Sequence, residues 1–158
     1  MKKDSRLSAV LHALLHMSEH GGPMTSDTLA RCMHTHAVVV RRTMAGLRDA
    51  GFVVSERGHG GGWVLARGLD SVTLLDVQLE LGEAPAPGDR LPPECLVEQA
   101  VQRALGQSLD EADALLARRL GEVTLADLAA DFHRGMAARG LHAVDIDHAH
   151  DKETTHAS

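Results

Sequence analysis

Aromatic side chains are nearly absent from this sequence of 158 residues, which contains two Phe, one Trp and no Tyr. Since hydrophobic residues still make up 44%, the core must consist mainly of Leu, Ala and Val, which favours packed helices over a β-sandwich. Cysteine is also scarce: Cys32 and Cys95 are too few for a disulfide framework, so both are expected to be reduced thiols. No apolar run approaches the ~20 residues that span a bilayer, and no secretory signal is present. We therefore expect a cytoplasmic protein without a membrane partner.

A net positive charge is also lacking, since the formal net charge is −6, but the two halves of the chain differ. Residues 1–68 carry nine Lys and Arg against five Asp and Glu, a net charge of +4. Residues 69–158 carry seven against seventeen, a net charge of −10. A basic front half and an acidic back half are typical of a module that meets a polyanion with one end only.

Apolar residues at helical spacing predict three helices in the front half. We expect one over 6–19 capped by Asp4 or Ser5, a short one capped by Thr25 or Ser26, and one over 37–50 that ends at Gly51. The third helix would turn Val40, Met44 and Leu47 inward and its basic residues outward.

Two β-prone runs, 52–57 and 63–67, flank the glycine-rich segment 58–62 and predict a hairpin. A phosphate-binding loop is excluded, because no Gly-Lys-Ser/Thr follows the glycines and a strand rather than a helix comes next. Three helices followed by a hairpin make a mainly α, winged helix-turn-helix fold, in which the third helix can enter the major groove of DNA.

The back half is predicted to be helical around one loop. A short helix over 73–81 precedes a loop that holds four of the five prolines, and a long helix over 94–120 follows. At 1.5 Å per residue that helix reaches ~40 Å, which is too long for one small domain to cover, so a partner helix and hence a homodimer are expected. Thr124 and Asp127 form a capping box for a last helix to about residue 139.

Several segments in this order resemble the Rrf2 family of winged-helix transcriptional regulators. They are RLSAVLHALL (6–15), VVVRR (38–42), GFV (51–53), GHGGGWVLAR (58–67), VTLLDV (72–77) and GEVTLADL (121–128). The resemblance covers roughly residues 5–135 and is most specific in the wing. It implies a homodimer on a pseudo-palindromic operator in double-stranded DNA, usually a repressor, with a sensor site between the DNA-binding part and the long helix.

The sequence pattern and the resemblance together divide the chain into four parts. These are a winged-helix DNA-binding domain (1–81), a sensor loop (82–93), dimerisation helices (94–140) and a polar, His-rich tail expected to be disordered (141–158).

The chain departs from the family pattern in its cysteines. Iron–sulfur members place three cysteines in and after the sensor loop, whereas only Cys95 lies in that region here. A three-cysteine iron–sulfur cluster within one subunit is therefore not expected. The cofactor stays unknown. The chain could bind no cofactor, or it could bind a cluster through fewer cysteines together with His or carboxylate ligands.

The predicted DNA contacts come from the third helix and the wing. Small residues in that helix let the backbone approach the groove while arginines reach phosphate or guanine. The candidates are Val38, Arg41, Arg42, Arg48, Arg57, His59, Gly60 and Arg67. A solvated helix face and a flexible hairpin tip are the plain structural alternatives.

Cys95 is the primary candidate for sensing, because a thiol at a helix start has its thiolate stabilised by free N–H groups. A small hydrophobic packing role is equally compatible with its chemistry. Cys32 is expected in the core, yet it could join Cys95 and His12 in a soft metal site. His12, His16 and His20 share one helix face, and a packed or exposed His stripe is the simpler explanation of that spacing.

Two other classes of function compete with a redox- or metal-switched regulator. One is a small enzyme with Cys95 as nucleophile and His133 as base, although no oxyanion or base motif adjoins either residue. The other is a winged-helix scaffold for protein partners, which the basic helix face disfavours. Salt-dependent binding to duplex DNA separates the regulator from both.

Overall fold

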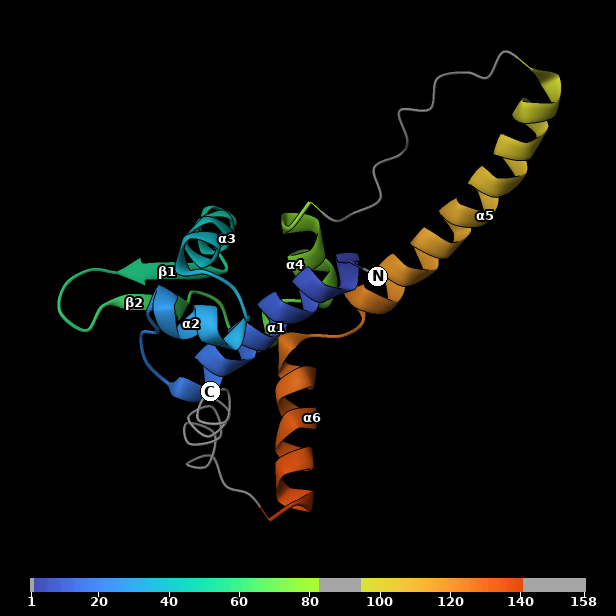
Figure 1. The fold of residues 1–158 in the computed structure, drawn as a ribbon. Helices are drawn as coiled ribbons and strands as arrows, with labels where there is room; N and C mark the ends of the chain where they lie inside the picture. The colour runs from blue at the N-terminus through green and yellow to red at the C-terminus, as the bar shows by residue number, and fades with distance from the viewer. Residues whose placement is uncertain (1, 83–94, 141–158) are drawn as a thin grey trace, which may run out of the picture.

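The computed structural model describes residues 2–82 and 95–140 (Figure 1). In chain order the elements are α1 (Lys2–His20), α2 (Ser26–Cys32), α3 (Ala37–Asp49), β1 (Val53–Glu56), β2 (Gly62–Leu65), the 3-10 turn η1 (Leu69–Ser71), α4 (Leu74–Glu80), α5 (Leu96–Gly121) and α6 (Leu125–Ala138). Figure 1 shows the first four helices and the hairpin gathered in one body, from which α5 projects on the side away from the wing. The predicted mainly α fold with a winged helix-turn-helix is thus confirmed. The predicted sensor loop, apart from Gly82, and the predicted tail lie outside the described residues.

The core lies where α1, α2 and α3 meet. Val10 and Leu14 of α1, Leu29 of α2 and the predicted inward residues of α3 are all fully buried. Large aliphatic side chains at three- and four-residue spacing thus supply the core that the few aromatic residues cannot.

Helix ends follow the predicted signals with one exception. Thr25 caps α2 by accepting a hydrogen bond from the N–H of Thr28 at 3.2 Å, and Gly51 ends α3 with φ +78°. Only glycine takes that left-handed conformation without strain. The prediction that Asp4 or Ser5 caps the first helix is wrong, because α1 already begins at Lys2. Lys2 and Lys3 are good helix formers and extend the helix past the expected cap.

The hairpin is a two-stranded antiparallel sheet with Val53 opposite Leu65 and Glu56 opposite Gly62. A β-bridge between Met24 and Trp63 ties its second strand to the segment before α2, through N–H···O bonds of 3.0 and 2.9 Å. Position 62 must be glycine there, because a Cβ would lie 2.5 Å from the carbonyl oxygen of Met24.

The junction between α5 and α6 is fixed to the body beside the start of α4. Thr73 and Thr124 form a β-bridge, and the Leu74 N–H donates to the Val123 carbonyl at 2.9 Å. Each threonine also begins a helix with a capping box, α4 through Asp76 and α6 through Asp127. The second box was predicted and is confirmed. Among the described residues of α5, by contrast, none is buried.

Among the described residues, no helix combines the length and the apolar character needed to cross a membrane.

Candidate nucleic-acid interface and thiol positions

Helix α3 has one buried face and one basic face. Val40, Met44 and Leu47 are fully buried and Thr43 nearly so, which holds the helix against the core. Val38, Arg41 and Arg42 are exposed on the other sides. Apart from Asp49 in the last turn, the exposed residues of this helix are apolar or cationic. The helix therefore presents a surface suited to a polyanion with apolar groups between its charges.

Two further candidate arginines, Arg48 and Arg67, already have partners inside the chain. Arg48 contacts its neighbour Asp49 at 2.9 Å. Arg67 donates from Nη2 to the carbonyl oxygen of Ala50 at 3.1 Å, and its guanidinium lies 5.0 Å from the ring centroid of Phe52. Because that carbonyl belongs to the C-cap residue of α3, Arg67 stabilises the C-terminal end of this helix in addition to carrying a charge.

The wing tip exposes the other three predicted residues. Arg57, His59 and Gly60 are all exposed in the loop between β1 and β2, and Gly60 takes φ +81°. The adjacent residues Gly60 and Gly61 have no side chains, which keeps the tip narrow. The tip therefore projects a cation and an imidazole with little bulk around them.

The anchor of the wing is a feature that the sequence analysis missed. The indole N–H of Trp63 donates to the Ser26 hydroxyl at 3.0 Å, from the second strand to the first turn of α2. The signal was present, since the single tryptophan of the chain needs a partner for its N–H once its ring is buried. Only the tertiary structure identifies Ser26 as that partner.

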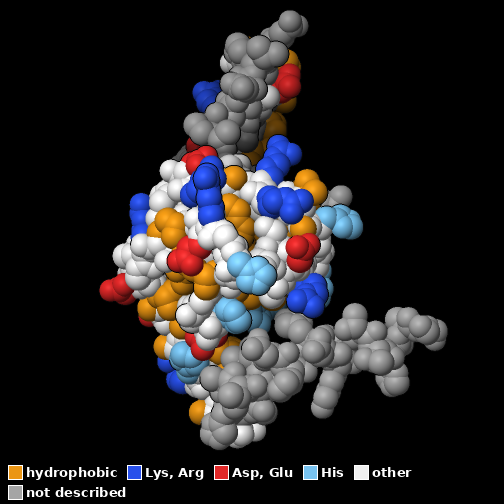
Figure 2. All heavy atoms as spheres, turned by 90° about the vertical axis from the view of Figure 1, so that its left-hand side faces the viewer, with side chains coloured by type: hydrophobic (Ala, Val, Ile, Leu, Met, Phe, Trp, Pro, Cys, Tyr) orange, Lys and Arg blue, Asp and Glu red, His pale blue; other side chains and the backbone are white. Residues whose placement is uncertain are grey.

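Basic and apolar side chains alternate on this side of the molecule. Figure 2, which views the side that carries the wing, shows blue Lys and Arg groups around orange hydrophobic patches, with a few carboxylates and several His side chains between them. The surface is thus mixed rather than uniformly basic, and a phosphate backbone would meet separate cationic groups.

Cys95 is exposed at the N-cap of α5. The N–H groups of Glu98 and Val97 lower the pKa of its thiol. A thiol with a lowered pKa has more thiolate at neutral pH, and the thiolate is the nucleophilic form. Its accessibility and its lowered pKa make Cys95 the better candidate of the two cysteines for thiol chemistry.

The other predicted sensor residues lie elsewhere. Cys32 is buried at the end of α2, as predicted, and burial raises the pKa of its thiol. His12 is exposed on α1, with its Nε2 atom 2.9 Å from Nε2 of His16. In the described parts of the chain no three His, Cys, Asp or Glu side chains are grouped so as to hold a metal ion. The proposed set of Cys95, Cys32 and His12 is therefore not assembled within one chain.

The pair required by the enzyme alternative is not assembled either. His133 lies on α6, where its Nε2 is 2.9 Å from Oε2 of Glu19 on α1. Cys95 begins α5 at the end that projects away from α6 (Figure 1). With the length of α5 between them, these two groups cannot act on one substrate within the same chain.

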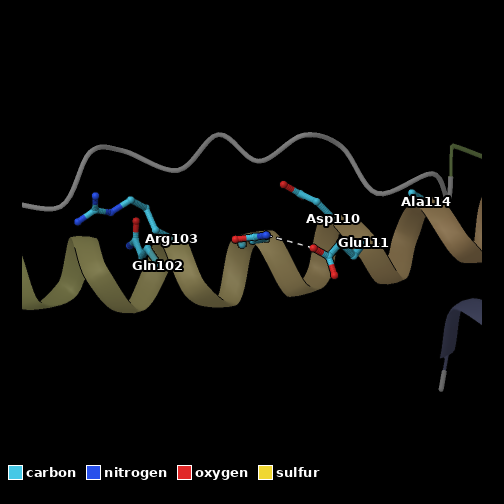
Figure 3. A pocket seen from close by; sticks show the side chains of 7 residues that line it. Gln102, Arg103, Asp110, Glu111 and Ala114 are labelled. Carbon is cyan, nitrogen blue, oxygen red and sulfur yellow. Dashed lines mark hydrogen bonds between the residues drawn. The ribbon is translucent and has the colours of Figure 1, made fainter.

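Helix α5 has an apolar side and a polar side. Its exposed large hydrophobic side chains recur at helical spacing: Val97, Val101, Leu105, Leu109 and Leu116 are each about half exposed or more. A shallow hollow on the polar side is lined by residues of α5, among them Arg103, Asp110 and Glu111; in Figure 3 the amide of Gln107 donates to Glu111, at 3.2 Å. Among the described residues, α5 alone supplies the lining of this open hollow.

The model of the Rrf2 family, described as iron-dependent transcriptional regulators, matches residues 4–131. No curated protein is a significant match to the chain. The iron of that description finds no ligand set among the described residues of a single chain, as the separation of the two cysteines and His12 shows.

Three solved structures illustrate the likeness. IscR of T. potens shares 25% identity over 78% of this chain and 82% of its own, with a TM-score of 0.53. CymR, described as the global cysteine regulator of B. subtilis, shares 23% over 82% and 95%, with a TM-score of 0.53. A protein from Lactobacillus plantarum described as a transcriptional regulator shares 22% over 96% and 99%, with a TM-score of 0.69. The last two show the fold alone.

Proposed function

Because this chain belongs to the Rrf2 family of transcriptional regulators, we propose that it binds a pseudo-palindromic operator as a homodimeric repressor switched at Cys95. The observation that carries the DNA-binding part is the division of α3 into a buried apolar face and an exposed face with Arg41 and Arg42. The wing tip with Arg57 lies beside that helix in the same body (Figure 1). A recognition helix in the major groove and a wing against the backbone would use these groups for base edges and phosphates.

The test is DNA binding by wild type and by R41A/R42A, measured by fluorescence anisotropy. The probe is a duplex enriched from a random-sequence library by the wild-type protein. The double variant is expected to lose ~2–6 kcal/mol of specific binding, since each good bidentate contact contributes ~1–3 kcal/mol. R134A/R139A on α6 removes the same charge far from α3 and serves as the control. If R41A/R42A is folded and binds like wild type, α3 is not the recognition helix.

The homodimer is supported by the exposed apolar side of α5. The row of Val and Leu side chains from Val97 to Leu116 runs along about 29 Å of helix and costs solvation free energy unless a partner covers it. A second copy in antiparallel orientation covers the row with the same row. Glu98 and Arg119 lie about six turns apart on roughly that side. In the antiparallel orientation, Glu98 of each copy therefore also faces Arg119 of the other copy. We therefore assign α5 as the dimerisation helix and expect half-sites about one helical turn apart.

The switch is supported by the chemistry of Cys95. Its thiolate can attack a hydroperoxide: an S–O bond forms, the O–O bond breaks, and the products are a sulfenic acid and water or an alcohol. The polar group so formed lies at the start of α5, the helix assigned to the dimer, so a shift there reaches both recognition helices.

Operator affinity with and without hydrogen peroxide tests the switch, with wild type and C95S side by side. Wild type should change its affinity after treatment, whereas C95S should keep one affinity. C32S, which removes the buried thiol, is the matched control and should respond like wild type. A full response in C95S would place the sensor elsewhere.

A further inference from the structure

We propose that Val38 recognises the 5-methyl group of a thymine, next to a guanine recognised by Arg42. This inference rests on the proposed function and goes further, since it names the bases that α3 reads in each half-site.

Val38 is the most exposed large hydrophobic residue of the helix-turn-helix, with 67% of its surface accessible. It contributes almost nothing to the core, because the buried residues of α3 all lie on the other side. An exposed β-branched residue is also a poorer helix former than the Ala or Lys that solvent would allow. Stability of the fold therefore gives no reason for valine at this position.

The positions of the buried residues show which side chains face outward. Val40, Thr43, Met44 and Leu47 are buried, so the centre of the opposite side passes through Val38, Arg42 and Ala45, at steps of four and three residues. Arg41 and Val39 lie on its two flanks. The outward stripe thus carries, from the N-terminal end, an isopropyl group, a guanidinium and a methyl group, and the carboxylate of Asp49, paired with Arg48, follows in the last turn.

Few groups on this helix could read an A·T pair by hydrogen bonding. Between Ala37 and Asp49 there is no Asn, Gln or Ser, and the single Thr43 is buried. Adenine is recognised in the major groove mostly by side-chain amides, whereas thymine also offers its methyl group to apolar side chains. An A·T pair facing the outward stripe can therefore be distinguished from G·C by the apolar contact of Val38 with that methyl.

Arg42 supplies the neighbouring contact. Side chains at i and i+4 on a helix are about 5–6 Å apart, and base pairs are stacked about 3.4 Å apart. Val38 and Arg42 thus reach base pairs that are adjacent or one step further apart. Arginine binds the O6 and N7 atoms of guanine, so each half-site should contain a thymine and a guanine within two base steps. The mixture of hydrophobic and basic groups in Figure 2 is consistent with such a surface.

The experiment removes one methyl group at a time from the DNA. The duplex enriched by wild type from a random library is synthesised with deoxyuridine in place of each thymidine in turn, in both half-sites, and affinity is measured by anisotropy. At one thymine per half-site the replacement should weaken wild-type binding about fourfold, the factor expected when one methyl-sized apolar contact is lost. V38A should bind the unmodified duplex more weakly and show no further loss at that position.

Two variants control the assignment. V39A removes the same atoms from the flank of α3 and should keep the sensitivity to deoxyuridine. R42A should keep that sensitivity too, while it loses discrimination at the neighbouring guanine. If the enriched duplex binds wild type yet no thymine is methyl-sensitive, or if V38A keeps the sensitivity, the assignment of Val38 is wrong and DNA binding stands. If no duplex is enriched, both the proposed DNA-binding function and the assignment of Val38 are wrong.

Discussion

Arg67 illustrates how one side chain near the proposed DNA-binding surface can be needed for the fold itself. It stacks on Phe52 and donates to the Ala50 carbonyl, so it holds the last turn of α3 against the second strand of the wing. Its prediction as a DNA contact came from its place after the hairpin alone. The structure adds a second role that sequence position does not reveal.

R67A is expected to lower the free energy of unfolding by ~1 kcal/mol, because an exposed hydrogen bond and an exposed cation–π contact each contribute roughly that amount or less. R67K keeps the charge but cannot stack and donate in the same plane, so it should lose most of the same stability. Urea unfolding measures both. If R67A unfolds like wild type and only DNA binding falls, Arg67 acts on DNA alone.

The two cysteines should differ sharply in reactivity. Since the N–H groups at the start of α5 lower the pKa of Cys95 and burial raises that of Cys32, the thiolate fraction at pH 7 is larger at Cys95. Iodoacetamide should therefore modify Cys95 first in the native protein and Cys32 only after unfolding, as followed by mass spectrometry. C95S should take up no label under native conditions. Equal labelling of both cysteines would contradict the assignment of a reactive and a core thiol.

At the scale of elements, two capping boxes join the wing domain to the rest of the chain. The carboxylate of Asp76 accepts from the N–H and the hydroxyl of Thr73 at 2.8 and 2.7 Å, and these bonds lower its pKa. Thr73 also forms the bridge to Thr124, so one residue fixes both the start of α4 and the junction of α5 with α6. A helix cap here positions a whole helix.

T73A should cost ~1 kcal/mol of stability, whereas T73S, which keeps the hydroxyl, should cost much less. The pH dependence follows from Asp76. Its pKa is depressed in the folded state, so its contribution is present above the ordinary value of 3.8 and is lost as the pH falls through the folded pKa. D76N should thus be less stable than wild type near neutral pH, and the difference should shrink below about pH 4. A difference that grows on acidification would contradict this sign.

At the scale of the whole molecule, the described residues form a body with a hydrophobic core, from which α5 projects with its apolar side exposed to solvent. The body has a buried hydrophobic core, although Val38 is exposed on it, whereas no residue of α5 is buried. The front half carries the basic side of α3, and α5 projects on the side away from the wing (Figure 1). That separation keeps the proposed DNA surface and the proposed dimer surface apart.

L116D should convert the dimer into a monomer, because a charge without a partner would be buried between the two helices. A114D adds the same charge on the polar side of α5 and should leave the dimer intact. Light scattering at micromolar concentration measures the mass of wild type and of both variants. A monomeric wild type, or an intact L116D dimer, would contradict the assignment of α5.

Local signals in the sequence were sufficient for the elements and for the inward side of α3. Apolar spacing placed Val40, Met44 and Leu47 in the core, glycine marked the end of α3, and Thr124 with Asp127 marked the start of α6. These features depend on a few neighbouring residues, so periodicity, backbone freedom and capping chemistry decide them locally. The start of α1 was misplaced because capping residues compete there with helix-forming lysines.

Contacts between distant segments were decided only by the tertiary structure. Trp63 finds Ser26 across 37 positions, Glu19 meets His133 across 114, and Arg67 turns back to α3. The same holds for the separation of Cys95 from Cys32 and His12. Sequence spacing carries no distance between residues on different elements, because packing of the whole core fixes how those elements lie against each other.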